Sequence, residues 1–147
     1  MPAVLVELER HGYRISTDPA LLDRTVIHRY LSDESYWAAG RSREASDRAI
    51  GHSQLVIGAY APDGAQVGFA RMVTDLATWA WLCDVFVLPD HQGDGLGPAM
   101  VGAIIEHPDV AHIKRQFIAT ADAHELDAKY GYRALADPAK WMERTAD

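Results

Sequence analysis

The chain has 147 residues, of which 48% are hydrophobic and 24% charged, with a formal net charge of −7. This profile is typical of one globular domain, and we expect it to span residues 1–147. The longest basic run is Lys114-Arg115, which disfavours nucleic acid as a partner, because phosphate binding needs clustered cations. No apolar run approaches the ~20 residues of a membrane span, so we expect no membrane partner. Cys83 is the only cysteine, so no internal disulfide can form, which favours a cytoplasmic location.

The hydrophobic pattern predicts a mixed α/β sheet with the element order βααβββαβαβ. Asp23 precedes the first helical pattern and can cap it, and a second helical pattern begins at Ser42 or Arg43. Pro62-Asp63-Gly64 is typical of a hairpin turn between two strands. The expected strands cover residues 13–17, 54–60, 66–74, 78–88, 115–120 and 132–135, and the expected helices cover residues 23–31, 43–50, 96–107 and 123–130.

Residues 85–100 are the most informative stretch of the sequence. An apolar run ends at Pro89, three glycines follow at positions 93, 95 and 97, and a helical pattern then begins. Glycines at the mouth of a helix let backbone N–H groups surround an anion, so we expect a phosphate or pyrophosphate ligand. The spacing fits neither the dinucleotide-binding nor the P-loop pattern. The alternative interpretation is a tight turn that only caps the helix.

Two segments together carry a family resemblance. Residues 92–97, Gln-Gly-Asp-Gly-Leu-Gly, resemble the Gln/Arg-x-x-Gly-x-Gly/Ala signature of the GNAT superfamily of acetyl-CoA-dependent N-acetyltransferases. Residues 120–132 resemble the family's late helix and its Gly-Phe/Tyr turn, and the similarity is firmest over residues 54–135. Tyr36-Trp37-Ala38 resembles a bacterial subgroup of undefined substrate. The resemblance implies a GNAT-like fold with a splayed central strand pair.

The resemblance also implies that acetyl-CoA is the co-substrate and that no metal is needed. Backbone N–H groups of the glycine loop would bind the pyrophosphate, helped by the helix dipole. The edge of the preceding strand would pair with the pantetheine arm and polarise the acetyl carbonyl. The expected cofactor-binding residues are Val85, Phe86, Val87, Gln92, Gly93, Asp94, Gly95, Leu96 and Gly97.

Four residues are candidates for proton transfer. Asp84 occupies the position where many family members carry a glutamate, and we expect its apolar neighbours to raise its pKa toward that of a useful base. The alternative for Asp84 is a strand carboxylate bonded to a neighbouring turn, and His124 is a second candidate base. The family's late-helix tyrosine, which protonates the leaving thiolate, corresponds here to Asp127. A protonated Asp127, the nearby Tyr130 or water would therefore have to supply that proton.

Aromatic residues are the candidates for acceptor binding. Tyr36 and Trp37 lie between the first two helices, which form the acceptor wall in the resembling family. For Trp79 and Trp81 we favour core packing, since strand alternation puts them with Cys83 on the face opposite Asp84. Cys83 has no identifiable activating partner, so we expect direct attack by the amine rather than an acyl-enzyme.

These observations predict an N-acetyltransferase that acetylates the primary amine of a small molecule. A weakly active or non-catalytic acyl-CoA-binding module is one alternative, and a protein lysine or N-terminal acetyltransferase is another. The acidic chain would mildly favour cationic small molecules, although solubility explains the charge better. Dimers are common in the resembling family, which suggests a homodimer.

Overall fold

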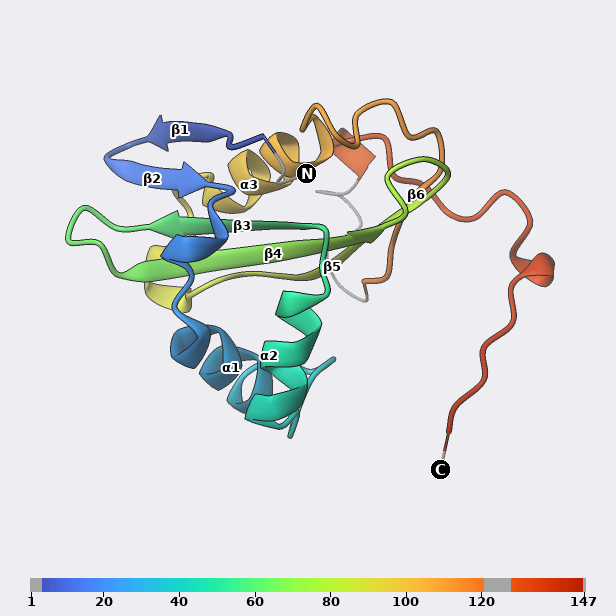
Figure 1. Cartoon of the computed structure of the whole chain (residues 1–147), viewed down its shortest axis with the longest axis horizontal. Helices are drawn as coiled ribbons and strands as arrows, with labels where there is room; N and C mark the ends of the chain where they lie inside the picture. Colours follow the sequence, from blue (N-terminus) through green and yellow to red (C-terminus); the bar gives the residue numbers. More distant parts are fainter. Residues whose placement is uncertain (1–3, 121–127, 147) are drawn as a thin grey trace.

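The computed structural model describes residues 4–120 and 128–146 (Figure 1). Within them, a six-stranded sheet has the order β1-β2-β3-β4-β5-β6. Neighbouring strands are antiparallel except β5 and β6, which run parallel. The strands are β1 (Glu7–Arg10), β2 (Tyr13–Ser16), β3 (Leu55–Tyr60), β4 (Gln66–Thr74), β5 (Ala80–Val87) and β6 (Gln116–Ile118), and the helices are α1 (Arg24–Asp33), α2 (Arg43–Gly51) and α3 (Leu96–Ile105).

Side chains cap the first two helices, and the cap at Asp23 is the one that the sequence predicts. The Asp23 carboxylate accepts from the backbone N–H groups of Thr25 and Val26, both at 3.1 Å. The Ser42 hydroxyl accepts from the N–H of Ala45 at 3.1 Å. Each cap occupies donors that the helix itself leaves open, which contributes about 1 kcal/mol. These local signals are why both helices begin within a residue of their expected starts.

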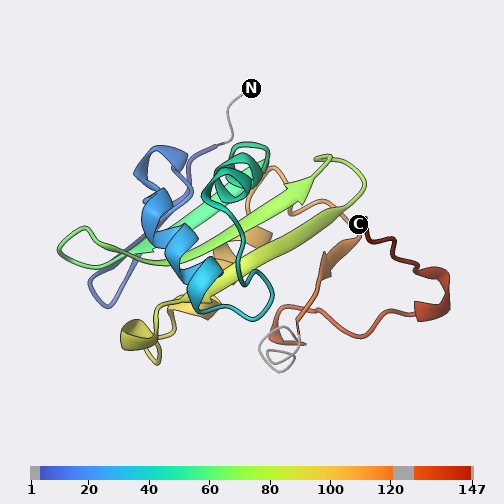
Figure 2. The same ribbon diagram turned by 90° about the horizontal axis from the view of Figure 1, so that it is seen from below.

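The sheet lies between two helical layers. Helices α1 and α2 cover one face, and α3 covers the other (Figures 1 and 2). On the α1–α2 face, Ile27 and Leu31 of α1 pack with Val56, Phe69 and Phe86 of the sheet. Burying each such side chain contributes roughly 1.5–3 kcal/mol, so this layer is fixed mainly by apolar packing. A second cluster joins α3 to β3, β4 and β5 on the opposite face.

Strand β5 carries an irregularity that decides the geometry of the site. The β4–β5 register changes between the pairs Phe69–Phe86 and Arg71–Cys83, so β5 has one extra residue there. Asp84 lies in this bulge with a φ of 55°. A positive φ is uncommon outside glycine, although aspartate tolerates it better than most residues. The bulge interrupts the alternation of side chains along β5.

The N-terminal strand β1 differs from the expected element order. It forms a hairpin with β2 through His11 and Gly12, whose φ angles are 50° and 84°. The sequence reasoning missed it because Glu7–Arg10 contains a single apolar residue, Leu8.

The C-terminal part also differs from expectation. Residues 132–135 do not form the expected strand: Tyr132 is half-buried and the next three residues are exposed. Strand β6 has only three residues, so it offers little edge for a further strand to join. Of the expected helix over 123–130, positions 128 and 129 are helical, and the rest up to 127 falls outside the described residues. No helix in the described part of the chain is long and apolar enough to span a bilayer.

Candidate functional site

A cavity of about 680 Å³ opens where β5, the loop after it and the α1–α2 connection meet. Its floor is the second half of β5, and the glycine loop and the start of α3 form one end. Aromatic and charged side chains from the α1–α2 connection and β4 form the other end. The residues that carry its chemistry are Tyr36, Trp37, Arg41, Arg71, Trp81, Asp84, Val85, Phe86, Val87, His91, Gln92, Gly93, Gly95, Leu96 and Gly97.

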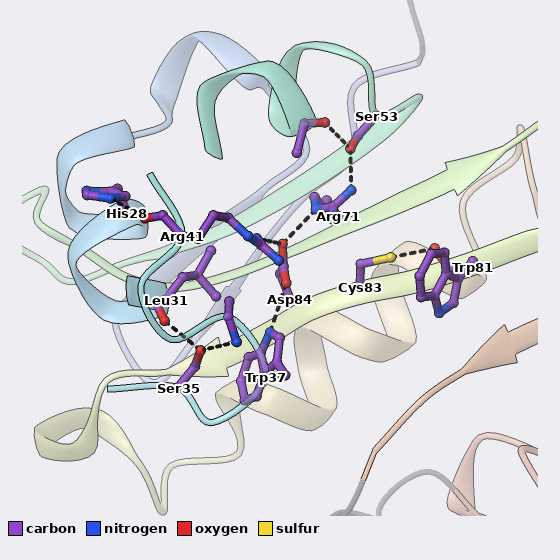
Figure 3. Close-up of polar contacts among 12 residues, drawn as sticks. His28, Leu31, Ser35, Trp37, Arg41, Ser53, Arg71, Trp81, Cys83 and Asp84 are labelled. Atoms are coloured by element: carbon purple, nitrogen blue, oxygen red, sulfur yellow. Dashed lines mark hydrogen bonds and ion pairs between the residues drawn. The ribbon is translucent and has the colours of Figure 1, made fainter. Parts of the chain in front are cut away.

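Asp84 is the centre of a buried charge cluster in this cavity (Figure 3). Its Oδ2 accepts from Arg71 Nε at 2.7 Å and from Arg41 Nη1 at 2.8 Å. Its Oδ1 accepts from Trp37 Nε1 at 2.9 Å. Alternation from Leu82 would turn Asp84 toward α3, but the bulge turns its carboxylate toward the α1–α2 connection instead. The backbone irregularity is thus what brings Asp84 into the cavity.

The pKa of Asp84 is lowered, which contradicts the expected rise. Burial is the largest influence on this pKa and acts to raise it. The hydrogen bonds from Arg41 and Arg71, the charge of Arg71 and the bond from Trp37 act in the opposite direction and together outweigh burial. Asp84 is therefore an ionised carboxylate at neutral pH, with both oxygens engaged. Its assignment as a general base stays a prediction, and the lowered pKa weighs against it.

The glycine loop presents open backbone at the start of α3. Gly93 and Gly95 have φ angles of 96° and 76°, a region that favours glycine. Gly95 is the N-cap of α3 and provides no side-chain cap. The first N–H groups of the helix, including those of Leu96 and Gly97, have no partner within the helix and form one wall of the cavity. An alanine Cβ at Gly93 would meet nothing within 4 Å, so the space beside this residue is open.

Two side chains hold this loop in place. Gln92 Nε2 donates to the carbonyl of Val87 at 2.9 Å and joins the loop to the end of β5. Arg10 Nε, on β1, donates to the carbonyl of Asp94 at 3.1 Å. A Cβ at Gly95 would lie 2.6 Å from Arg10 Nη2, so a larger residue here would displace this guanidinium in addition to straining a backbone with a φ of 76°. Arg10 adds positive charge beside the helix N-terminus, and no sequence signal connects it to a loop 84 residues away.

Among the described residues, none pairs with the β6 side of the second half of β5, as expected for a splayed strand pair. Strand β6 pairs with β5 only over the three pairs from Ala80–Gln116 to Leu82–Ile118. Beyond them, Val85, Phe86 and Val87 line the cavity rather than pair with β6. Backbone groups on such an edge can accept an extended ligand as an added strand.

Three of the aromatic residues that line the cavity are Tyr36, Trp37 and Trp81, and one of them, Trp81, was expected in the core. Tyr36 and Trp37 both line the cavity, with their rings in an edge contact at 5.1 Å. Trp81, expected in the core, is 43% exposed and also lines the cavity, and Trp79 is 38% exposed. The core-packing interpretation of both is wrong, because neither tryptophan belongs to the apolar cluster on either face of the sheet.

The proton-transfer candidates of the late helix are only partly described. His124 and Asp127 lie outside the described residues. Tyr130 is described: its hydroxyl donates to the carbonyl of Pro98 at 2.6 Å, and its ring packs beside Gly102 of α3. The structure therefore places Tyr130 against α3, with its hydroxyl proton already donated.

Cys83 is buried, and its pKa is raised to about 11, first of all by desolvation. Its thiol contacts the carbonyl of Trp81 at 3.5 Å, which gives it no activating base. Cys83 is therefore a neutral thiol near pH 7.

Sequence reasoning missed four residues of the site or its support. Arg41 and Arg71 reach Asp84 from separations of 43 and 13 residues, and Arg10 reaches the loop from β1. His91 lines the cavity, and its Nδ1 is 2.9 Å from the hydroxyl of Tyr13. No cluster of three or more histidine, cysteine or acidic residues that could hold a metal occurs in residues 4–120 and 128–146.

Comparison with known proteins gives the family of this fold and cavity. Residues 21–133 match the model of the acetyltransferase (GNAT) family. A Gibberella zeae protein that is provisionally named an acetyltransferase is 32% identical over 138 residues, covering 82% of this chain and 78% of that protein.

Solved structures agree with the family match. A Xanthomonas campestris pv. campestris protein assigned to the GNAT family has a TM-score of 0.88 and 43% identity, covering 94% of this chain and 96% of that one. A Clostridium acetobutylicum protein described as a predicted acetyltransferase and solved with acetyl-CoA has a TM-score of 0.66 and 14% identity, covering 90% and 94% of the two chains, and shares the fold. With its mixed sheet, glycine loop and family match over residues 21–133, this chain belongs to the acetyltransferase (GNAT) family.

Proposed function

We propose that this chain transfers the acetyl group of acetyl-CoA to the primary amine of a small molecule, by direct attack of the amine. The observation that carries the proposal is that one cavity contains both the open N-terminus of α3 and the open edge of β5. An acyl-CoA needs both features, since it has a pyrophosphate at one end and a thioester on an extended arm at the other.

The residues at the loop fit a pyrophosphate. Backbone N–H groups of Gly95, Leu96 and Gly97 lie at the start of α3, where the helix dipole adds partial positive charge. The open space beside Gly93 leaves room for close approach of the phosphate oxygens. Pro98 has no N–H, and its place in the first turn suits proline. Arg10 would add a favourable charge to this end of the cavity.

The edge of β5 supplies the groups for the reacting end. Val85 and Val87 can exchange backbone hydrogen bonds with the amides of the pantetheine arm. A backbone N–H on this edge would donate to the carbonyl oxygen of the thioester, which gains negative charge as the amine attacks. These donors are fixed by the β4–β5 pairing, so they need no rearrangement during the reaction.

The ionised state of Asp84 determines how the acceptor amine loses its proton in this proposal. Because its pKa is lowered and both its oxygens are bonded, Asp84 anchors the cavity wall in this proposal instead of accepting the amine proton. The amine then reacts in its neutral form, having lost its proton to water. A thiol has a pKa of about 8.5, so the departing thiolate can also leave without an acid. Roles of His124 and Asp127 in proton transfer stay predictions.

The end of the cavity lined by Tyr36, Trp37, Arg41, Arg71 and Asp84, called here the acceptor end, suits a small molecule better than a protein segment. Tyr36, Trp37 and Trp81 surround it with aromatic rings, which suits the body of a small amine. A homodimer, a single domain over residues 1–147 and a cytoplasmic location also stay predictions, which size-exclusion chromatography, limited proteolysis and cell fractionation would test.

Titration calorimetry with acetyl-CoA and a thiol-release assay over a panel of small amines test the proposed function. We expect acetyl-CoA binding and amine-dependent release of CoA thiol. Binding without release for any amine would indicate a binding module instead. Release only with peptides or proteins would indicate a protein acetyltransferase, and the absence of acetyl-CoA binding would refute the proposal.

A further inference from the structure

Counted over the described residues, the end of the cavity near Asp84 has a net positive charge, in a chain whose own net charge is −7. Two guanidinium groups, Arg41 and Arg71, line this end together with one carboxylate, Asp84. No other Asp, Glu, Lys or Arg among the described residues lines the cavity. After the ion pairs with Asp84 are formed, the described residues leave one positive charge without a counter-charge.

Arg41 has hydrogen-bond capacity left for a ligand. A guanidinium carries five N–H donors. Within the described residues, Arg41 donates one side-chain hydrogen bond, to Asp84, whereas Arg71 donates to both Asp84 and Ser53. Arg41 is also the more accessible of the two, with 23% of its side chain exposed against 13% for Arg71. Arg71 is therefore mainly a support, and Arg41 is the group that can meet a ligand.

The position of Arg41 is fixed from both sides. Its backbone carbonyl lies 2.8 Å from Nε2 of His28 on α1, and its side chain is held by Asp84 (Figure 3). A guanidinium that is held in this way loses little conformational freedom on binding, and its planar fork matches a carboxylate. A cationic group placed here would be repelled, which argues against a polyamine acceptor.

We propose that the acceptor is an amino-carboxylate, whose carboxylate is bound by Arg41 while its neutral amine faces the edge of β5. This inference rests on the proposed acetyl transfer and names the class of its acceptor. A single carboxylate neutralises the one positive charge that the described lining residues leave uncompensated. The rings of Tyr36, Trp37 and Trp81 would contact the carbon skeleton between or beside the two groups.

The test compares matched ligands on the protein saturated with CoA, so that binding is measured without turnover. The probes are amino acids with aromatic, aliphatic and ω-amino skeletons, each paired with its carboxamide. We expect calorimetry to show that at least one amino acid binds about 10- to 100-fold more tightly than its amide, the range for a hydrogen bond to a charged group. An amino acid amide has the less basic amine, so amine ionisation does not favour the acid.

Two variants test whether Arg41 causes the preference for an amino acid over its amide. Arg41→Gln should abolish the discrimination between acid and amide while the affinity for CoA stays unchanged. Asp84 keeps its bonds from Arg71 and Trp37 in this variant, and a melting curve checks that it folds. Arg43→Gln is the matched control, because Arg43 lies two positions further on, bonded to Asp47 and Thr25, and outside the cavity.

The outcomes separate this inference from the proposed function. Equal binding of every acid and amide pair, or a preference that survives in Arg41→Gln, would overturn the amino-carboxylate acceptor alone. Failure of the unmodified protein to bind CoA would overturn the proposed function and this inference with it. Loss of the preference in Arg41→Gln, with Arg43→Gln behaving like the unmodified protein, supports the inference.

Discussion

Arg71 and Asp84 meet at 2.7 Å between Nε and Oδ2, across the point where the β4–β5 register shifts. This ion pair depends on the bulge in β5, and it contributes to the charge of the cavity. The extra residue in β5 gives Asp84 a φ of 55° and turns its carboxylate out of the regular alternation. Arg71, on the neighbouring strand, then supplies the counter-charge that keeps this buried carboxylate ionised.

Replacing Asp84 by asparagine tests this ion cluster. Asparagine tolerates a positive φ, so the change removes the charge with little added backbone strain. Two guanidinium groups then lose their buried partner, and we expect the free energy of unfolding to fall by roughly 3 kcal/mol at pH 7. Urea denaturation measures this difference.

The pH dependence of Asp84→Asn follows from the lowered pKa. A carboxylate with a lowered folded-state pKa stabilises the fold above its unfolded pKa of about 3.9, and this contribution is lost as the pH falls through the folded value. The difference in stability between the two proteins should therefore begin to shrink below about pH 4 and disappear only once the pH is below the folded-state pKa of Asp84. Asp47→Asn is the control, because Asp47 also meets two arginines but is 37% exposed, so we expect a loss under about 1 kcal/mol. An undiminished difference at pH 3 would contradict this account.

Replacing Gly93 by alanine tests the pyrophosphate site. Gly64 offers a matched control, since both glycines have a φ above 90° and neither would place a Cβ within 4 Å of other atoms. Both alanine variants carry the same backbone strain, on the order of 1 kcal/mol. Only Gly93 lines the main cavity, so calorimetry should show at least about tenfold weaker acetyl-CoA binding for Gly93→Ala alone. Equal affinity of the two variants would place the pyrophosphate elsewhere.

The rate should depend on pH through the acceptor and not through Asp84. Since the pKa of Asp84 is lowered, it is ionised throughout the neutral range and does not add a titration step there. We expect kcat/KM to rise with pH, with a midpoint that shifts with the pKa of each acceptor amine. Steady-state kinetics with amines of graded basicity measure this shift. A midpoint shared by all amines would instead indicate a base in the protein.

Replacing Tyr130 by phenylalanine separates a structural from a catalytic hydroxyl. The bond to the Pro98 carbonyl should contribute about 1 kcal/mol, so Tm should fall by about 2–4 °C with kcat nearly unchanged. Tyr60→Phe serves as the control, because the buried Tyr60 hydroxyl has no hydrogen-bond partner among the described residues and its removal should cost nothing. A tenfold fall in kcat for Tyr130→Phe would identify this phenol as the acid.

Cys83 should resist alkylation at neutral pH. Its pKa of about 11 leaves it protonated, and the thiol becomes reactive only as the pH approaches that value. Iodoacetamide labelling followed by mass spectrometry should show little modification at pH 7.5. Rapid labelling of the folded protein, or loss of activity on labelling at that pH, would contradict a buried, inert thiol.

Features with a local signal were predictable from the sequence. The cap at Asp23, the end of β5 before Pro89 and the start of α3 after Gly95 each depend on a few neighbouring residues. The glycine loop was recognised for the same reason, because its spacing is contiguous in the chain. The strand β1 was missed, since Leu8 alone gives no apolar alternation.

The sequence by itself determined the family, the order of most elements and the loop at the start of α3. Only the tertiary structure decided the charge of the cavity, because Arg41 and Arg71 approach Asp84 from other elements and one extra residue in β5 aims that carboxylate at them. A hydrophobic pattern records which face of a strand is buried, but it does not encode a bulge or a partner 43 residues away. Apolar neighbours alone therefore predicted a raised pKa for Asp84, whereas two long-range guanidinium groups lower it.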